Sequence, residues 1–318
     1  MSKLNFIAIC VLSMFTSLSN AQHTDQINSN RPGVTMSAFA VGKSVIQVET
    51  GLFAIHENHS LLGYDAKGFG ADLTLRYGAF MERLEIVGNL QYQNADYVTD
   101  FSTTTKAGLK QTVLGAKFLI YDPFKNYEKK INLYSWKANQ KFNWRQLVPA
   151  VSIYAGANFT MKNNPYYFSA NPDISPKIML ITQNHLGDGS WVFVTNIIAD
   201  YITTDFPSYG YAITLTKGIN EKWSGFIENQ GYKSDFYSDA IVRGGAAFLL
   251  NKDMQIDASI SRNFKDTPTV LYGGIGFSWR YDANYKEVRI NLDKEGKKTS
   301  KSEKKVEKKD NKRKDAIE

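Results

Sequence analysis

Between residues 44 and 281 the chain alternates apolar and polar residues one by one, and no other feature restricts its fold as strongly. The apolar phase of residues 67–79 consists of Phe69, Ala71, Leu73, Leu75 and Tyr77. The other phase holds glycines and polar residues, among them Asp72, Thr74 and Arg76. Because successive side chains of a β-strand point to opposite faces, such a run predicts a strand with one apolar and one polar face.

Twelve runs of this kind follow one another. They lie at residues 44–55, 67–79, 81–93, 107–121, 147–160, 177–187, 190–201, 209–219, 222–232, 241–250, 253–263 and 270–281. Each holds roughly ten residues or slightly more, the length that crosses a bilayer when a strand is tilted, whereas strands of soluble sandwiches mostly have about five or six. Twelve is also even, as bacterial outer-membrane barrels require. We therefore expect an all-β protein, a twelve-stranded antiparallel transmembrane β-barrel over residues 44–281.

Composition excludes several other classes of protein. Beyond residue 21 no stretch approaches the ~18 consecutive apolar residues of a membrane helix, which excludes a polytopic helical membrane protein. With 43% hydrophobic and 13% aromatic residues, the chain is neither collagen-like nor wholly disordered. A transmembrane barrel stays compatible with this composition, since its alternating strands make it hydrophilic on average.

The first 21 residues have the pattern of a secretory signal peptide. A charged start at Lys3 precedes a mostly apolar stretch, and a small-x-small cleavage site ends at Ala21. The only cysteine is Cys10, so the exported chain has no disulfide, thiolate nucleophile or cysteine metal site. A lipoprotein leader using Cys10 is disfavoured, because residues 7–10 are a poor lipobox and lie too early. Residues 22–43 then form an N-terminal periplasmic segment ahead of the barrel.

The connections between the runs divide into short and long ones. Tight turns are expected at 78–80, 187–189, 218–221 and 251–253, and longer polar loops at 56–66, 94–106, 161–176, 202–208, 233–240 and 264–269. If both termini are periplasmic, all four tight turns fall on the periplasmic side and all six longer loops fall outside. The basic connection at 122–146 breaks this rule, and it predicts either an interfacial segment against anionic lipid or a packed loop or short plug.

The inward phase carries the ionisable side chains that we expect to line the lumen. These are Glu49, Asp72, Arg76, Arg83, Glu85, Asp200, Glu228, Arg243, Asp257 and Arg280. Charges inside a barrel either line an aqueous path or pair with one another into a salt-bridged core. Four arginines against six carboxylates favour a partly plugged, weakly selective lumen over a strongly charged pore.

Nothing in the sequence supports catalysis. His56 and His59 are three residues apart, whereas the metalloprotease helix motif places its histidines four apart. There is no Gly-x-Ser-x-Gly elbow, P-loop or Rossmann fingerprint. We expect no enzyme activity, no cofactor and no metal. On the outward phase, aromatic residues near the strand ends fit the girdles of a membrane barrel, namely Trp191, Tyr201, Tyr209, Tyr211, Trp223, Trp279 and Tyr281.

Several stretches resemble a Bacteroidetes-type outer-membrane "transporter" family, also called the MetA-pathway of phenol degradation family. They are Ser-Asn-Arg-Pro-Gly at 29–33, the run 45–51, Leu-Gly-Ala-Lys-Phe at 114–118, the runs 225–231 and 244–257, and the closing 273–280. The resemblance covers about residues 29–281. It implies an outer-membrane channel for small hydrophobic or aromatic compounds. Gly274, Phe277 and Trp279 also have the Gly-x-x-aromatic-x-aromatic form that barrel-assembly machinery recognises.

Residues 282–318 form a tail that the family pattern does not contain. Residues 294–318 hold eleven basic and six acidic residues and almost nothing to bury, so we expect disorder. The tail is either merely solvated or in contact with peptidoglycan, anionic lipid or an acidic periplasmic partner, and an exported chain does not meet nucleic acid.

The leading hypothesis is a non-catalytic outer-membrane channel or transporter-like barrel, surrounded by outer-membrane lipid, for a small-molecule solute. The first alternative is a structural barrel whose tail binds an envelope partner. The second is a soluble secreted or periplasmic β-protein.

Overall fold

The computed structural model describes residues 26–123, 125, 134, 144–161, 164–167, 172–187 and 189–282. The predictions for the signal peptide, for the lysine-rich tail and for most of the 122–146 connection therefore lie outside the described residues. Among the described residues, no helix is long and apolar enough to cross a membrane.

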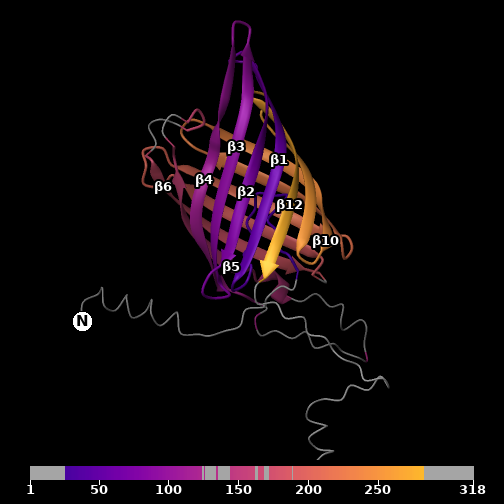
Figure 1. Cartoon of the computed structure of the whole chain (residues 1–318). Coiled ribbons are helices and arrows are strands. Elements are labelled where there is room, and N and C mark those ends of the chain that lie inside the picture. The colour runs from indigo at the N-terminus through magenta and orange to yellow at the C-terminus, as the bar shows by residue number, and fades with distance from the viewer. Residues whose placement is uncertain are drawn as a thin grey trace, which may run out of the picture. The chain divides into compact units, whose positions relative to one another are not determined.

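Twelve antiparallel strands close into a barrel, as the sequence predicts (Figure 1). They are β1 (Val45–His59), β2 (Tyr64–Gly78), β3 (Leu84–Thr99), β4 (Thr103–Tyr121), β5 (Ala150–Phe159), β6 (Ile174–Leu186), β7 (Trp191–Asp200), β8 (Ser208–Gly218), β9 (Trp223–Lys233), β10 (Ser238–Asn251), β11 (Met254–Asn263) and β12 (Thr269–Asp282). A 3₁₀ helix, η1 (Trp144–Leu147), precedes β5. Each strand pairs with its neighbours in sequence, and β12 closes the barrel against β1.

The two ends of the barrel differ. We call the end where Val45 of β1 pairs with Asp282 of β12 the turn end, and the opposite end, where Asn58 pairs with Thr269, the loop end. The turn end is the lower end in Figure 1, where the arrowhead of β12 points. The β3–β4 hairpin rises farthest at the loop end (Figure 1).

Two of the expected loops are strands instead. Most of residues 56–66 and 94–106 continues the ladders of β1 to β4, and the connections shrink to short turns at 60–63 and 100–102. Beyond the apolar band both faces of these hairpins meet water, so the residues there need no alternation. The periodicity of the sequence therefore ends before the backbone pairing does.

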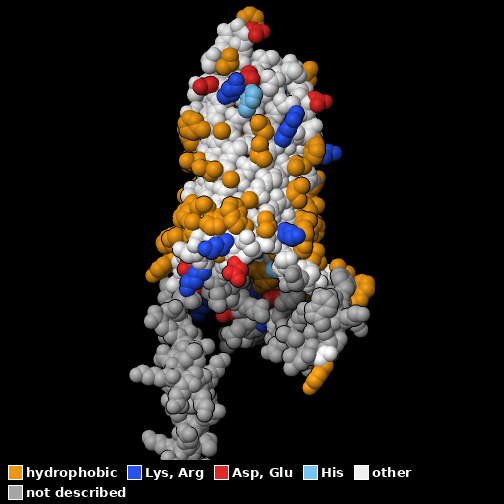
Figure 2. Space-filling view, turned by 90° about the vertical axis from the view of Figure 1, so that its right-hand side faces the viewer, with side chains coloured by type: hydrophobic (Ala, Val, Ile, Leu, Met, Phe, Trp, Pro, Cys, Tyr) orange, Lys and Arg blue, Asp and Glu red, His pale blue; other side chains and the backbone are white. Residues whose placement is uncertain are grey.

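The outer wall is apolar and the lumen is polar. Outward side chains such as Leu52, Ile227 and Ile275 are more than half exposed. The expected girdle residues Trp191, Tyr209, Tyr211, Trp223, Trp279 and Tyr281 are also exposed on this face. Tyr201 differs, because it lies in the turn after β7 and is partly buried. Figure 2 shows hydrophobic side chains over the wall, with most charged ones toward the two ends. This is the surface of a barrel that crosses a bilayer.

Candidate functional site: the plugged lumen

Residues 26–43, which we call the plug, run through the lumen before the chain enters β1. The amide of Ile27 donates to the carbonyl of Lys252 over 2.7 Å, and the amide of Ser44 donates to the carbonyl of Gly78 over 2.8 Å. Between these points Thr35, Ser37 and much of the remaining plug are buried. The sequence predicts residues 22–43 to lie in the periplasm ahead of the barrel, whereas residues 26–43 lie inside it. The physical reason is that polar side chains of the wall, and not a paired strand, satisfy the plug backbone.

Glu228 of β9 anchors the plug through several hydrogen bonds to one carboxylate. Its carboxylate accepts hydrogen bonds from the amides of Val34 (2.9 Å) and Thr35 (3.0 Å) and from the Thr35 hydroxyl (2.7 Å). The hydroxyl of Thr214 donates to it over 2.8 Å, and Arg243 forms an ion pair with it. Glu228 is 1% exposed. Bonds from several donors to a buried carboxylate are among the stronger protein hydrogen bonds.

Amide and hydroxyl side chains hold the middle of the plug much as a neighbouring strand would. Asn196 accepts from the amide of Met36 over 2.6 Å and donates to its carbonyl over 2.9 Å. Gln183 accepts from the amide of Ala38 over 3.0 Å, and Ser152 donates to the carbonyl of Ala38 over 2.6 Å. These wall residues come from β5, β6 and β7, so one short segment is tied to three separate strands.

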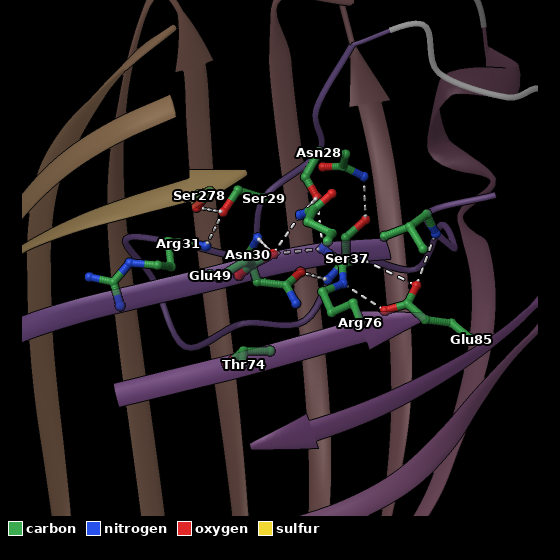
Figure 3. Close-up of polar contacts among 12 residues, drawn as sticks. Asn28, Ser29, Asn30, Arg31, Ser37, Glu49, Thr74, Arg76, Glu85 and Ser278 are labelled. Carbon is green, nitrogen blue, oxygen red and sulfur yellow. Dashed lines mark hydrogen bonds and ion pairs between the residues drawn. The ribbon is translucent and has the colours of Figure 1, made fainter. Parts of the chain in front are cut away.

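A buried network of four charges holds the end of the plug nearest β1. Arg76 lies between Glu85, 2.6 Å from its Nε, and Glu49, 3.0 Å from its Nη1 (Figure 3). Lys117 pairs with Glu85 over 3.1 Å and donates to the plug carbonyls of Ser37 and Phe39 over 2.8 and 2.9 Å. All four side chains are almost completely buried. The two positive charges balance the two negative ones, so no net charge is buried. The hydrogen-bond donors of Lys117 that do not face Glu85 bind the plug.

Arg31 is the charged residue that the plug itself contributes. Its guanidinium binds Asp257 through two nitrogens, at 3.2 and 3.3 Å, and forms an ion pair with Asp72. It lies against Gly51 and Gly276, where an added Cβ would overlap it. Burial lowers the pKa of Arg31, but Asp257 and Asp72 raise it by more, so the pKa ends above the ordinary value. Arg31 is therefore a permanent cation in a space that only glycines leave open.

Nine of the ten ionisable residues expected in the lumen lie on the inward phase of a strand, and Arg83 lies in the turn before β3. Seven of them form the plug contacts or network described above: Glu49, Asp72, Arg76, Glu85, Glu228, Arg243 and Asp257. Asp200 pairs with Lys177 over 2.8 Å, and Arg280 pairs with Asp282 over 3.6 Å. Arg83 has no ion pair within the described part of the chain. Most of these charges therefore pair with one another.

Several charged residues of the lumen were not among those predicted from the alternation of the sequence. Lys117 was not recognised because β4 has apolar residues on both faces near it, with Val113 inward and Leu114 outward, so the alternation does not show which face is the lumen. Lys110 was not recognised because it is the extra residue of a bulge: Gln91 of β3 pairs with Gln111, the next residue Tyr92 pairs with Leu109, and Lys110 between them has no partner in the ladder. A bulge of this kind breaks the period of two. Arg31 was not recognised because it precedes the first strand, where there is no alternation to assign it to the lumen.

Two chambers lie on either side of the plug. A cavity of about 610 Å³ opens toward the turn end, lined by plug residues together with Gln183, Thr216 and Gln255. A second cavity, of about 470 Å³, lies in the middle of the barrel between the plug and residues such as Tyr154 and Tyr272. Residues 30–33 line both cavities, so the plug is the partition between them. Among the described residues no three potential metal ligands gather.

The family model described as "Putative MetA-pathway of phenol degradation" matches residues 29–281. The chain belongs to this family. The resemblance inferred from the motifs is thereby confirmed, and the matched range takes in both the plug from Ser29 onward and the barrel up to Tyr281. Plug and barrel are therefore parts of one family unit.

Solved structures similar to the chain share little sequence with it. The COG4313 outer membrane channel from Pseudomonas putida F1 is 11% identical, with a TM-score of 0.48, covering 80% of this chain and 100% of that one. The CymD monoaromatic hydrocarbon channel is 8% identical, with a TM-score of 0.43, covering 76% and 90%. The translocator domain of the autotransporter NalP from Neisseria meningitidis is 7% identical, with a TM-score of 0.45, covering 79% and 90%. None of the curated proteins compared with the chain matches it significantly.

Proposed function

We propose that the protein is a non-catalytic channel of the bacterial outer membrane that lets small solutes pass through its lumen. Both termini and the turn end face the periplasm in this proposal. The observation that carries it is the pair of chambers, about 610 and 470 Å³, inside a barrel whose outer wall is apolar. Such volumes are in the range that small-molecule sites occupy in proteins.

The plug sets the state of the channel. It is held by hydrogen bonds and ion pairs to polar side chains and belongs to no sheet, so it can leave its place without breaking the ladder of the barrel. We expect a narrow path while the plug is docked and a wider one when an anchor is lost. Aromatic side chains along the middle chamber, among them Phe53, Tyr154 and Tyr232, suit a solute with an apolar face.

Conductance across a planar bilayer tests the proposal. We expect the purified protein to give small steps and the variant Glu228→Ala to give larger or longer ones, because the anchor of Val34 and Thr35 is gone. Glu221→Gln removes one carboxylate from the exposed turn between β8 and β9 and should leave the steps unchanged. An absence of conductance in the protein and in Glu228→Ala alike would overturn the channel function.

A further inference from the structure

Lys110 differs from the other cations of the middle chamber. Four cations line this chamber, and three of them have carboxylate partners: Arg31 pairs with Asp72 and Asp257, Lys177 with Asp200, and Arg243 with Glu228. For Lys110, no carboxylate of the described part of the chain lies within ion-pairing distance. Its ammonium instead donates to two neutral oxygens, Gln93 Oε1 at 3.1 Å and the Tyr272 hydroxyl at 3.3 Å.

The position of Lys110 places this charge on the wall of the middle chamber. Lys110 belongs to β4, whereas Tyr272 belongs to β12, and three strands separate the two around the wall. The side chain therefore reaches across the lumen, and its ammonium lies 5.6 Å from the centre of the Tyr272 ring. The bulge at Lys110 supplies the extra residue on β4. Lys110 and Tyr272 both line the middle chamber, so a solute inside the chamber can reach this contact.

Aromatic rings stand beside the free charge. Phe53 of β1 and Tyr272 pack edge to face, with ring centres 6.1 Å apart, and both line the chamber. Gly70 and Gly274 pair with Phe53 on either side, and a Cβ on Gly70 would overlap the Phe53 ring. Because Tyr272 accepts its bond from Lys110, its own hydroxyl hydrogen remains available to donate. One cation, one hydroxyl donor and two rings thus converge on one space.

We infer that this space binds a small aromatic carboxylate, with the carboxylate on Lys110 and Tyr272 and the ring against Phe53. The inference rests on the proposed channel function and specifies its solute class. A carboxylate accepts charge-assisted hydrogen bonds from an ammonium and a phenol, and these are stronger than bonds to the neutral Gln93. Glu49 and Asp72 also face the chamber, but cations already pair with both. Toward the loop end, Glu57 accepts a hydrogen bond from Tyr64, and Asp239 accepts hydrogen bonds from Tyr237 and Asn263.

Calorimetric titration of the full chain in detergent micelles tests this inference, with benzoate and its neutral isostere benzamide as probes. We expect benzoate to bind about tenfold or more tighter than benzamide, and Lys110→Gln to abolish that difference. Lys110→Arg should keep most of it. Lys106→Gln is the matched control, since it removes the same charge from the same strand outside the chamber, over the Tyr97 ring, and it should preserve the preference.

Three results would overturn the inference: equal binding of benzoate and benzamide, an unchanged preference in Lys110→Gln, or the same loss in Lys106→Gln. Heat-modifiable migration in gels shows that each variant is folded before it is titrated. The channel function is judged separately by conductance. Conductance without a benzoate preference rejects only the solute class, and a benzoate preference without conductance rejects only the channel.

Discussion

Arg76 has carboxylates on two sides, and its removal should be costly. Arg76→Ala leaves Glu49 and Glu85 buried with less compensation, and breaking a buried pair costs about 3–5 kcal/mol. We expect the free energy of unfolding in micelles to fall by that amount, measured by denaturant titration of tryptophan fluorescence. Arg262→Ala is the control, because Arg262 is exposed and has no ion pair among the described residues. A similar loss in both variants would contradict the role of the network.

Two glycines of β12 give a second prediction at this scale. A methyl group on Gly276 would overlap the Arg31 guanidinium, whereas a methyl group on Gly273 meets no atom within 4 Å. Gly276→Ala should therefore displace Arg31 and loosen the plug, and Gly273→Ala should not. The measurement is the rate at which a small thiol reagent modifies Ser37→Cys, which is buried while the plug is docked. Equal rates in the two backgrounds would mean that Arg31 does not hold the plug.

At the scale of the strand, the phase of β2 predicts opposite results for adjacent residues. Leu73 faces outward, whereas Thr74 faces the lumen and donates to Asn89 over 2.8 Å. A cation that faces lipid near the midplane costs about 2–4 kcal/mol, so Leu73→Arg should lower the membrane-inserted yield. Thr74→Arg should be inserted almost normally. Equal yields, judged by heat-modifiable migration of the membrane fraction, would contradict this phase.

The twelve strands could be predicted from sequence because lipid on one side and polar lumen on the other impose a strict alternation. Where water replaces lipid, as at residues 56–66 and 94–106, the alternation stops and the strands were expected to be loops. The plug could not be predicted in this way, since an extended segment held by side chains has no periodicity. Glu228 and Asp257 could be found by phase, but not their role as partners of Thr35 and Arg31. The assembly role of Gly274, Phe277 and Trp279 stays a prediction.

At the scale of the whole molecule, the proposed orientation predicts which end of the barrel the cell exposes. The only cysteine of the chain is Cys10, within the predicted signal peptide, so a cysteine placed after residue 21 is the single labelling site once that peptide is removed. Asp100→Cys lies in the β3–β4 turn at the loop end, and Lys252→Cys lies in the β10–β11 turn at the turn end. A membrane-impermeant maleimide on intact cells should label Asp100→Cys alone. Labelling of Lys252→Cys alone would mean that the turn end, and not the loop end, faces the outside of the cell.

The plug also constrains the order in which the molecule is made. It precedes all twelve strands in the chain, yet its partners Glu228 and Asp257 follow Thr35 and Arg31 by 193 and 226 residues. Arg31 also rests on Gly276 of the last strand. Its docking cannot be complete until β9, β11 and β12 have taken their places. The lumen therefore stays open at the turn end while the barrel is being assembled. Complete docking of the plug marks the point at which β12 has joined the barrel.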